Sequence, residues 1–189
     1  PVAKDENGVA NRYVCANLTV KSLGGGQAGP TVIAVNPEYL NCYIQDDHHY
    51  RLEVYNAFYD ADGLYPVDVT KLRLKKGQTI KLAFRLPGIT WTDGADPKVV
   101  FGHNFDDLAA FNWDSNDAGV FSNPSVSLNK DGVTEISLTN TTSGTLKFEG
   151  ASCFSICIQQ KGLVVSPLDA DGNLDATVVK PEIVSLTIE

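Results

Sequence analysis

The sequence predicts an all-β fold, an antiparallel β-sandwich of jelly-roll type, on three observations. Apolar and polar residues alternate with a period of two in one run after another, as in strands that bury one face. These runs are short, and Gly, Asn, Asp and Pro separate them. No stretch of ten or more residues has a convincing 3.6-residue period, and roughly nine short strands at this chain length are typical of a jelly roll.

Residues 71–86, KLRLKKGQTIKLAFRL, show the alternation best. Lys-Gly-Gln at 76–78 is a turn signal between two alternating runs, and Lys81 and Arg85 fall on the outward phase. These residues therefore predict a hairpin with one solvated face. Further strands are predicted over 50–59, 133–140, 145–150 and 153–159. The inward positions from 71 onward are Leu72, Leu74, Ile80, Leu82, Phe84, Leu86, Ile136, Leu138, Leu146, Phe148, Phe154, Ile156 and Ile158.

The chain divides into three parts. Residues 1–30 form a polar lead-in with the Gly-rich loop SLGGGQAGP, and 31–177 form the sandwich domain. Residues 178–189 contain Lys-Pro before a new alternating run, so they are either a short C-terminal linker into a following domain or the closing strand. The tetrapeptide DADG occurs at 60–63 and at 169–172, and in both places it predicts a hairpin turn.

Composition excludes several classes of partner. The net charge of −8 argues against nucleic acid and against an anionic membrane surface, and no apolar run is long enough to insert into a membrane. A chain without Met is expected to be a segment of a longer protein with further domains. The cysteines, Cys15, Cys42, Cys153 and Cys157, form no CxxC pair, so we interpret them as small buried hydrophobic residues; a Cys15–Cys42 disulfide stays open.

The two tryptophans are the candidate ligand contacts. Trp91 lies in GITWTDG and Trp113 in AFNWDSND, both among short polar side chains. The flat face of an indole stacks on the C–H side of a pyranose, and nearby carboxylate and amide oxygens accept its hydroxyls. The alternative is that one or both rings close an end of the sandwich. The predicted hydroxyl partners of Trp113 and Trp91 are Asn104, Asp106, Asn112 and Asp114.

Asp169, Asp171 and Asp175 alternate in DADGNLD and are the candidate metal ligands. Oxygen ligands at this spacing are similar to the first half of a calcium loop, which would hold a structural Ca²⁺. However, a complete calcium loop has Gly at its sixth position and Glu at its twelfth. Counted from Asp169, Gly172 is at the fourth position here, and no Glu is at the twelfth. A solvated hairpin turn is the alternative interpretation, and no cofactor is required.

From the sequence we expect that the protein is not an enzyme. It has no GxSxG motif, and His103 has no partner in a recognisable catalytic pattern. QDDHHY at 45–50 is interpreted as a polar turn, because neighbouring histidines on a strand face opposite sides.

The order of segments from 71 to 159 resembles a carbohydrate-binding module, or galactose-binding-like jelly roll, of surface glycan-binding lipoproteins in gut Bacteroidetes. The resemblance rests on KLRLKKGQTIKLAFRL, then VVFGHNFDDLAAFNWDS, LNKDGVTEISLTN and FEGASCFSICIQ. It implies a non-catalytic module that binds poly- or oligosaccharides, exported to the cell surface or periplasm. It also implies the structural calcium that many such modules carry.

A second resemblance keeps another class open. YRLEVYNAFYDADGLYPV is similar to the strand–DxDG–strand pattern of Bacteroidetes fimbrial and adhesin subunits. In such a structural subunit Tyr55, Tyr59 and Tyr65 would pack instead of binding a ligand. That class would also need a groove or terminal strand for strand donation.

Overall fold

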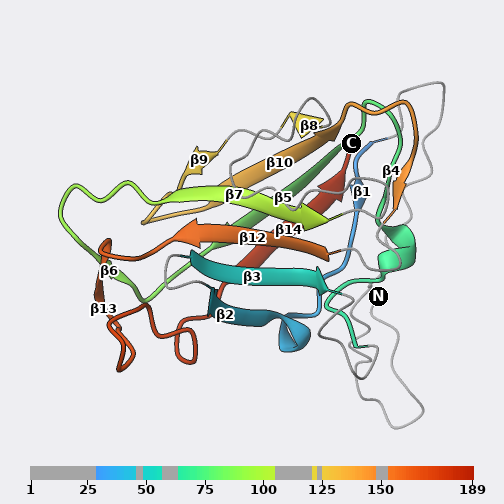
Figure 1. The fold of residues 1–189 in the computed structure, drawn as a ribbon. Coiled ribbons are helices and arrows are strands. Elements are labelled where there is room, and N and C mark those ends of the chain that lie inside the picture. Colours follow the sequence, from blue (N-terminus) through green and yellow to red (C-terminus); the bar gives the residue numbers. More distant parts are fainter. Residues whose placement is uncertain (1–28, 46–48, 57–63, 105–120, 123–124, 148–152) are drawn as a thin grey trace, which may run out of the picture.

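The computed structural model describes residues 29–45, 49–56, 64–104, 121–122, 125–147 and 153–189. They form two five-stranded antiparallel sheets around one hydrophobic core (Figure 1), which confirms the predicted all-β, sandwich-like fold. The first sheet has the order β1 (Thr31–Val32), β14 (Glu182–Ile188), β5 (Thr79–Arg85), β10 (Thr134–Asn140), β8 (Phe121–Ser122). The second has the order β2 (Asn41–Gln45), β3 (His49–Asn56), β12 (Cys153–Gln159), β7 (Lys98–Asn104), β9 (Val126–Ser127).

Small elements lie at the two ends of the sandwich. One two-stranded ribbon pairs β4 (Arg73–Leu74) with β11 (Leu146–Lys147), and another pairs β6 (Thr90–Trp91) with β13 (Val164–Ser166). Two short 3-10 helices, η1 (Pro37–Tyr39) and η2 (Val69–Lys71), precede β2 and β4. Helices of membrane-crossing length and hydropathy are absent from the described part of the chain.

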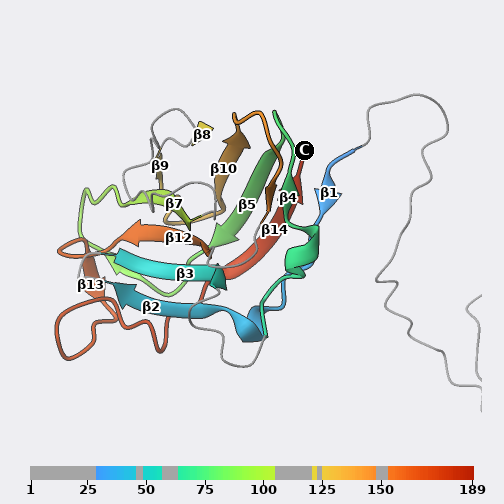
Figure 2. The same cartoon turned by 45° about the vertical axis from the view of Figure 1, so that its right-hand side comes forward.

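The chain winds alternately between the two sheets. After the β2–β3 pair it passes to β5, back to β7, then to β8, β9 and β10 in alternation, and finally from β12 to β14. Figure 2 shows β2, β3, β12 and β7 in one layer and β5, β10 and β14 in the other. Strands that are distant in sequence therefore become neighbours, and loops gather at the two ends.

The inner faces carry the apolar residues that the alternation predicts. All the predicted inward residues are buried, except Phe148, which lies outside the described residues. The outer face of the first sheet is partly solvated, whereas β3 and β12 are buried on both faces. The outer-face residues of the second sheet with less than a tenth of their surface exposed include Arg51, Glu53, Val100, Ser155 and Cys157.

The predicted 71–86 hairpin is wrong in its pairing. Its turn is present, because Gln78 N–H donates to the Lys75 carbonyl and Gly77 has a φ of +79°. However, β4 pairs with β11, while β5 lies between β14 and β10. The buried side chain of Asn140 donates to the Leu74 and Gly144 carbonyls and so holds β4 beside the β10–β11 connection.

The C-terminal residues and the second DADG turn also have a defined place. Of the two interpretations of residues 178–189, the structure has a strand, because β14 pairs with β5 on one side and β1 on the other.

At the second DADG, Asp169 N–H donates to the Asn173 carbonyl and Gly172 has a φ of +80°, as a tight hairpin turn requires.

Candidate functional site

The structure places two of the predicted ligand residues, Asn104 and Trp91, at opposite ends of the sandwich. Asn104, the last residue of β7, faces Cys153, which in turn faces Asn56 at the end of β3. Trp91 lies beyond the other ends of these strands, where β6 pairs with β13 (Figure 1). One site therefore cannot include both Trp91 and Asn104. The end of the second sheet at which β3 and β7 terminate is called the Asn104 end below.

Trp91 has the environment of a ring that closes the sandwich. It is partly exposed, faces Val164 across the ribbon and packs against the core. Its indole N–H is buried and has no hydrogen-bond partner among the described residues. A sugar-stacking indole presents its face to solvent and uses its N–H, so this placement gives Trp91 no support as a ligand contact.

The remaining predicted contacts are not described. Asp106, Asn112, Trp113 and Asp114 lie outside the described residues, and so does the side chain of Asn104. Because β7 ends at Asn104, the segment that contains Trp113 begins at the Asn104 end. Stacking by Trp113 stays a prediction.

Two carboxylates of the candidate calcium loop, Asp169 and Asp175, accept hydrogen bonds from groups two to four residues further along the chain. Asp169 Oδ1 accepts the N–H groups of Asp171 and Asn173, at 3.0 and 2.8 Å. Asp175 Oδ1 accepts the N–H and hydroxyl of Thr177, which lowers the pKa of this carboxyl. Among the described residues no three His, Cys, Asp or Glu side chains lie close enough to hold a metal ion, so the calcium prediction gains no support.

Two of the four cysteines, Cys42 and Cys157, are described, and Cys42 forms no disulfide with a described cysteine. Cys15 lies outside the described residues, so the Cys15–Cys42 bridge that the sequence left open is not tested. Burial raises the pKa of the Cys42 thiol despite a hydrogen bond with Tyr50, and the hydroxyl of Tyr50 donates to the Val179 carbonyl. Cys157 is buried on the outer face of the second sheet, as expected of a small hydrophobic residue.

A depression of about 550 Å³ opens at the Asn104 end, between residues 34–39 and 64–68. Tyr39 is 41% exposed and Leu64 54% exposed, whereas Tyr65 is partly buried. This volume lies in the range of about 300–1,000 Å³ that small-molecule sites occupy. We call it the tyrosine depression. Its lining residues are Ala34, Val35, Asn36, Tyr39, Leu64, Tyr65, Pro66, Val67 and Asp68.

Main-chain bonds fix the two walls of the tyrosine depression. Val35 and Val67 form an antiparallel bridge, and Asn36 N–H donates to the Pro66 carbonyl at 2.6 Å. The Tyr65 ring lies 4.6 Å from that of the buried Tyr55, centroid to centroid. The site is therefore held by the fold and not by long side chains alone.

Polar groups stand at both walls. Asn36 caps η1, because its Oδ1 accepts the Glu38 N–H, and its Nδ2 group has no partner among the described residues. Asp68 Oδ1 accepts the N–H and hydroxyl of Thr70, and this hydrogen bonding lowers the pKa of Asp68. At neutral pH the site thus offers an amide donor, a carboxylate acceptor and the exposed aromatic side chain of Tyr39.

Sequence reasoning missed this site. Tyr39 was not singled out, and Tyr65 was considered only as a packing residue. The available signal was NPEY at 36–39, in which an N-cap Asn followed by Pro starts a helical turn and so places Tyr39. The pairing of this turn with residues 64–68 is a tertiary contact without a local signal.

Comparisons with known proteins identify no matching family model, no matching curated protein and no matching solved structure.

Proposed function

We propose that this chain is a non-catalytic carbohydrate-binding module of an exported, cell-surface or periplasmic protein. The observation that carries the proposal is the tyrosine depression, in which an exposed aromatic ring stands beside an uncommitted amide and an ionised carboxylate. A pyranose has an apolar C–H face that packs on tyrosine, and hydroxyls that both donate and accept. The three groups match those requirements.

The winding of the chain supports the same proposal. Strands that alternate between two sheets are expected of a jelly roll, a fold that lectin domains use. We propose the jelly-roll type for this sandwich on that basis. Loops and short helices then gather at the ends of the sheets, where ligand contacts can vary without disturbing the core.

Affinity gel electrophoresis against neutral and acidic plant, mucin and microbial polysaccharides tests the proposal. We expect one glycan class to retard the wild type, and Tyr39→Ala to lose that retardation while its circular dichroism is unchanged. Trp113→Ala tests whether the predicted stacking loop belongs to the same site. Trp91→Phe is the matched aromatic control at the opposite end and should bind normally. Absence of retardation by every glycan would refute the proposal.

An adhesin-type structural subunit is the second candidate, and the edge of the first sheet favours it. β1 pairs with Thr187 and Ile188 alone, and Ile33 N–H reaches the Leu186 carbonyl. Among the described residues no strand covers positions 182–185 of β14 on that side. An open edge can accept a strand from another chain. Ladders of polymers on unheated denaturing gels at high protein concentration would favour this candidate over glycan binding.

A further inference from the structure

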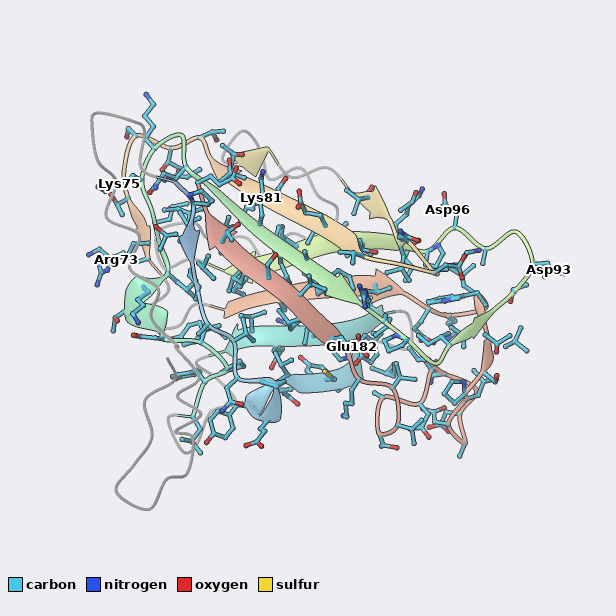
Figure 3. All side chains as sticks on the ribbon, turned by 180° about the vertical axis from the view of Figure 1, so that it is seen from behind. Arg73, Lys75, Lys81, Asp93, Asp96 and Glu182 are labelled. Carbon is cyan, nitrogen blue, oxygen red and sulfur yellow. The ribbon has the colours of Figure 1, made fainter. Side chains whose placement is uncertain are left out.

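Basic residues gather on the ribbon beside the tyrosine depression. The chain has 15 Lys and Arg against 23 Asp and Glu, yet five of the 15 lie within residues 71–76 and on the neighbouring strand β11. Figure 3 shows Arg73 and Lys75 at one end of the molecule and Asp93 and Asp96 at the other. We call the group the basic ribbon; its members are Lys71, Arg73, Lys75, Lys76 and Lys147, all exposed.

Two positive side chains of the basic ribbon lie opposite each other. Arg73 directly faces Lys147 across the antiparallel ribbon, and like charges in that position destabilise a sheet. Elsewhere Lys81 pairs with Glu189, Arg85 with Glu182 and Lys98 with Asp96. Arg73, Lys75 and Lys76, by contrast, form no ion pair with any described residue. Three positive charges thus lie on one short segment of an acidic protein without an ion pair to a described residue.

The basic ribbon is attached to the depression. Lys71 Nζ lies 3.4 Å from Asp68 Oδ2, and Asp68 is a wall residue. Arg73 Nε donates to the carbonyl of Thr70, whose hydroxyl donates to Asp68. Asn140 anchors the ribbon to β10 through the Leu74 carbonyl. A ligand chain that leaves the depression on this side would therefore meet Lys71 and Arg73 first.

We propose that the ligand is an anionic polysaccharide, whose uronate or sulfate groups the basic ribbon binds while a sugar ring occupies the tyrosine depression. This inference rests on the proposed glycan-binding function and names its substrate class. The net charge of −8 opposes any long polyanion away from this ribbon, nucleic acid and polysaccharide alike, but the tyrosine depression beside the ribbon suits a sugar ring and so favours the polysaccharide. Guanidinium and ammonium groups are the donors that carboxylate and sulfate oxygens prefer.

The test uses glycan pairs that differ in charge alone. The probes are polygalacturonate against its methyl-esterified form, and a sulfated galactan against its desulfated, neutral form, each titrated at two salt concentrations. We expect the charged member of one pair to bind at least tenfold more tightly, and this advantage to shrink at high salt. A single-stranded DNA of matched charge should bind more weakly than that glycan.

Two double variants test whether the preference for the charged glycan depends on the basic ribbon. Lys75→Gln/Lys76→Gln should weaken binding of the charged glycan about fivefold and leave its neutral partner unaffected. Lys130→Gln/Lys180→Gln removes the same charge from exposed sites outside the ribbon and should have little effect. Any of three results would overturn the inference. The charged and neutral glycans could bind equally, both double variants could lose the same affinity for the charged glycan, or the DNA could bind more tightly than that glycan. Binding of neutral glycans alone would leave the proposed function standing, whereas binding of no glycan would refute both.

Discussion

Arg51 Nε lies 3.2 Å from Glu53 Oε1 on the outer face of the second sheet, and the two side chains are 7% and 3% exposed. Glu53 also accepts hydrogen bonds from Asn41 Nδ2 and the Tyr43 hydroxyl. Arg51 donates to Ser155 and Gln45 and lies over the Tyr43 ring. The network joins the edge strand β2 to β3 and β12 and so fixes the register of this sheet.

Removal of one charge from this buried pair should be costly. Glu53→Gln leaves the Arg51 guanidinium buried without its counter-charge, and we expect the free energy of unfolding to fall by about 3 kcal/mol. Glu135→Gln, at an exposed position of β10, is the matched control and should change it by less than about 0.5 kcal/mol. Urea denaturation measures both. A loss below about 1 kcal/mol for Glu53→Gln would show that the pair does not stabilise this sheet.

Stability should decline in alkali because of Cys42 and Tyr50. Burial raises the pKa of both groups above their ordinary values of 9.0 and 10.0. From about pH 9 for Cys42 and about pH 10 for Tyr50, the unfolded chain loses the proton more readily than the folded chain does. The unfolded state then binds fewer protons, so the free energy of unfolding decreases as pH rises, by at most about 1.4 kcal/mol per pH unit for each group.

Single variants show which of the two groups causes the decrease in the free energy of unfolding at high pH. Cys42→Ala should reduce the slope from about pH 9, and Tyr50→Phe should reduce it above about pH 10. Tyr39→Phe removes an exposed phenol and is the matched control for Tyr50→Phe. Denaturant titrations from pH 7 to 11 provide the measurement. Identical slopes in all four proteins would contradict the assignment.

Trp91 should tolerate loss of its N–H but not loss of its ring. Trp91→Phe removes a buried donor without a partner among the described residues, so we expect stability to change by less than about 1 kcal/mol. Trp91→Ala leaves a void at the end of the core and should cost about 3 kcal/mol. Thermal unfolding of the two variants compares these effects. Equal losses would indicate that the indole N–H makes an essential bond.

The DADGNLD turn should be stable without metal. Asp169→Ala removes the acceptor of two backbone N–H groups, so a loss of about 1 kcal/mol is expected with or without calcium. Thermal unfolding of the wild type in CaCl₂ and in EDTA measures directly whether calcium stabilises the protein. A midpoint several degrees higher in calcium, abolished by Asp169→Ala, would instead establish the calcium loop.

The strands were predictable because each carries its own local pattern. Ile136, Leu138, Phe154, Ile156 and Ile158 alternate along their strands and are all buried. The sequence does not encode the partner of each strand in the same local way. Leu74 precedes a good turn, yet β4 joins β11 because Asn140, 66 residues away, bonds to its carbonyl. A side chain that specifies pairing through distant main-chain groups leaves no periodic signal.

The candidate site was less predictable for the same reason. Trp91 lies among Thr, Asp and Gly in sequence, which is typical of an exposed loop, but its β6–β13 pairing turns the ring toward the core. Tyr39 and Tyr65 stand 26 positions apart and share a site only through the Val35–Val67 bridge. Local composition therefore indicated candidate residue types, but it did not locate the tyrosine depression, which the fold assembles from distant segments.

The most direct test of glycan recognition at the Asn104 end is an amide chemical-shift titration with oligosaccharides of the glycan that retards the protein most. The account predicts that the largest shifts occur at residues 34–39 and 64–68 and continue to Arg73, and that Tyr39→Ala abolishes them. Shifts confined to the β6–β13 ribbon around Trp91, or no saturable shifts at all, would contradict it.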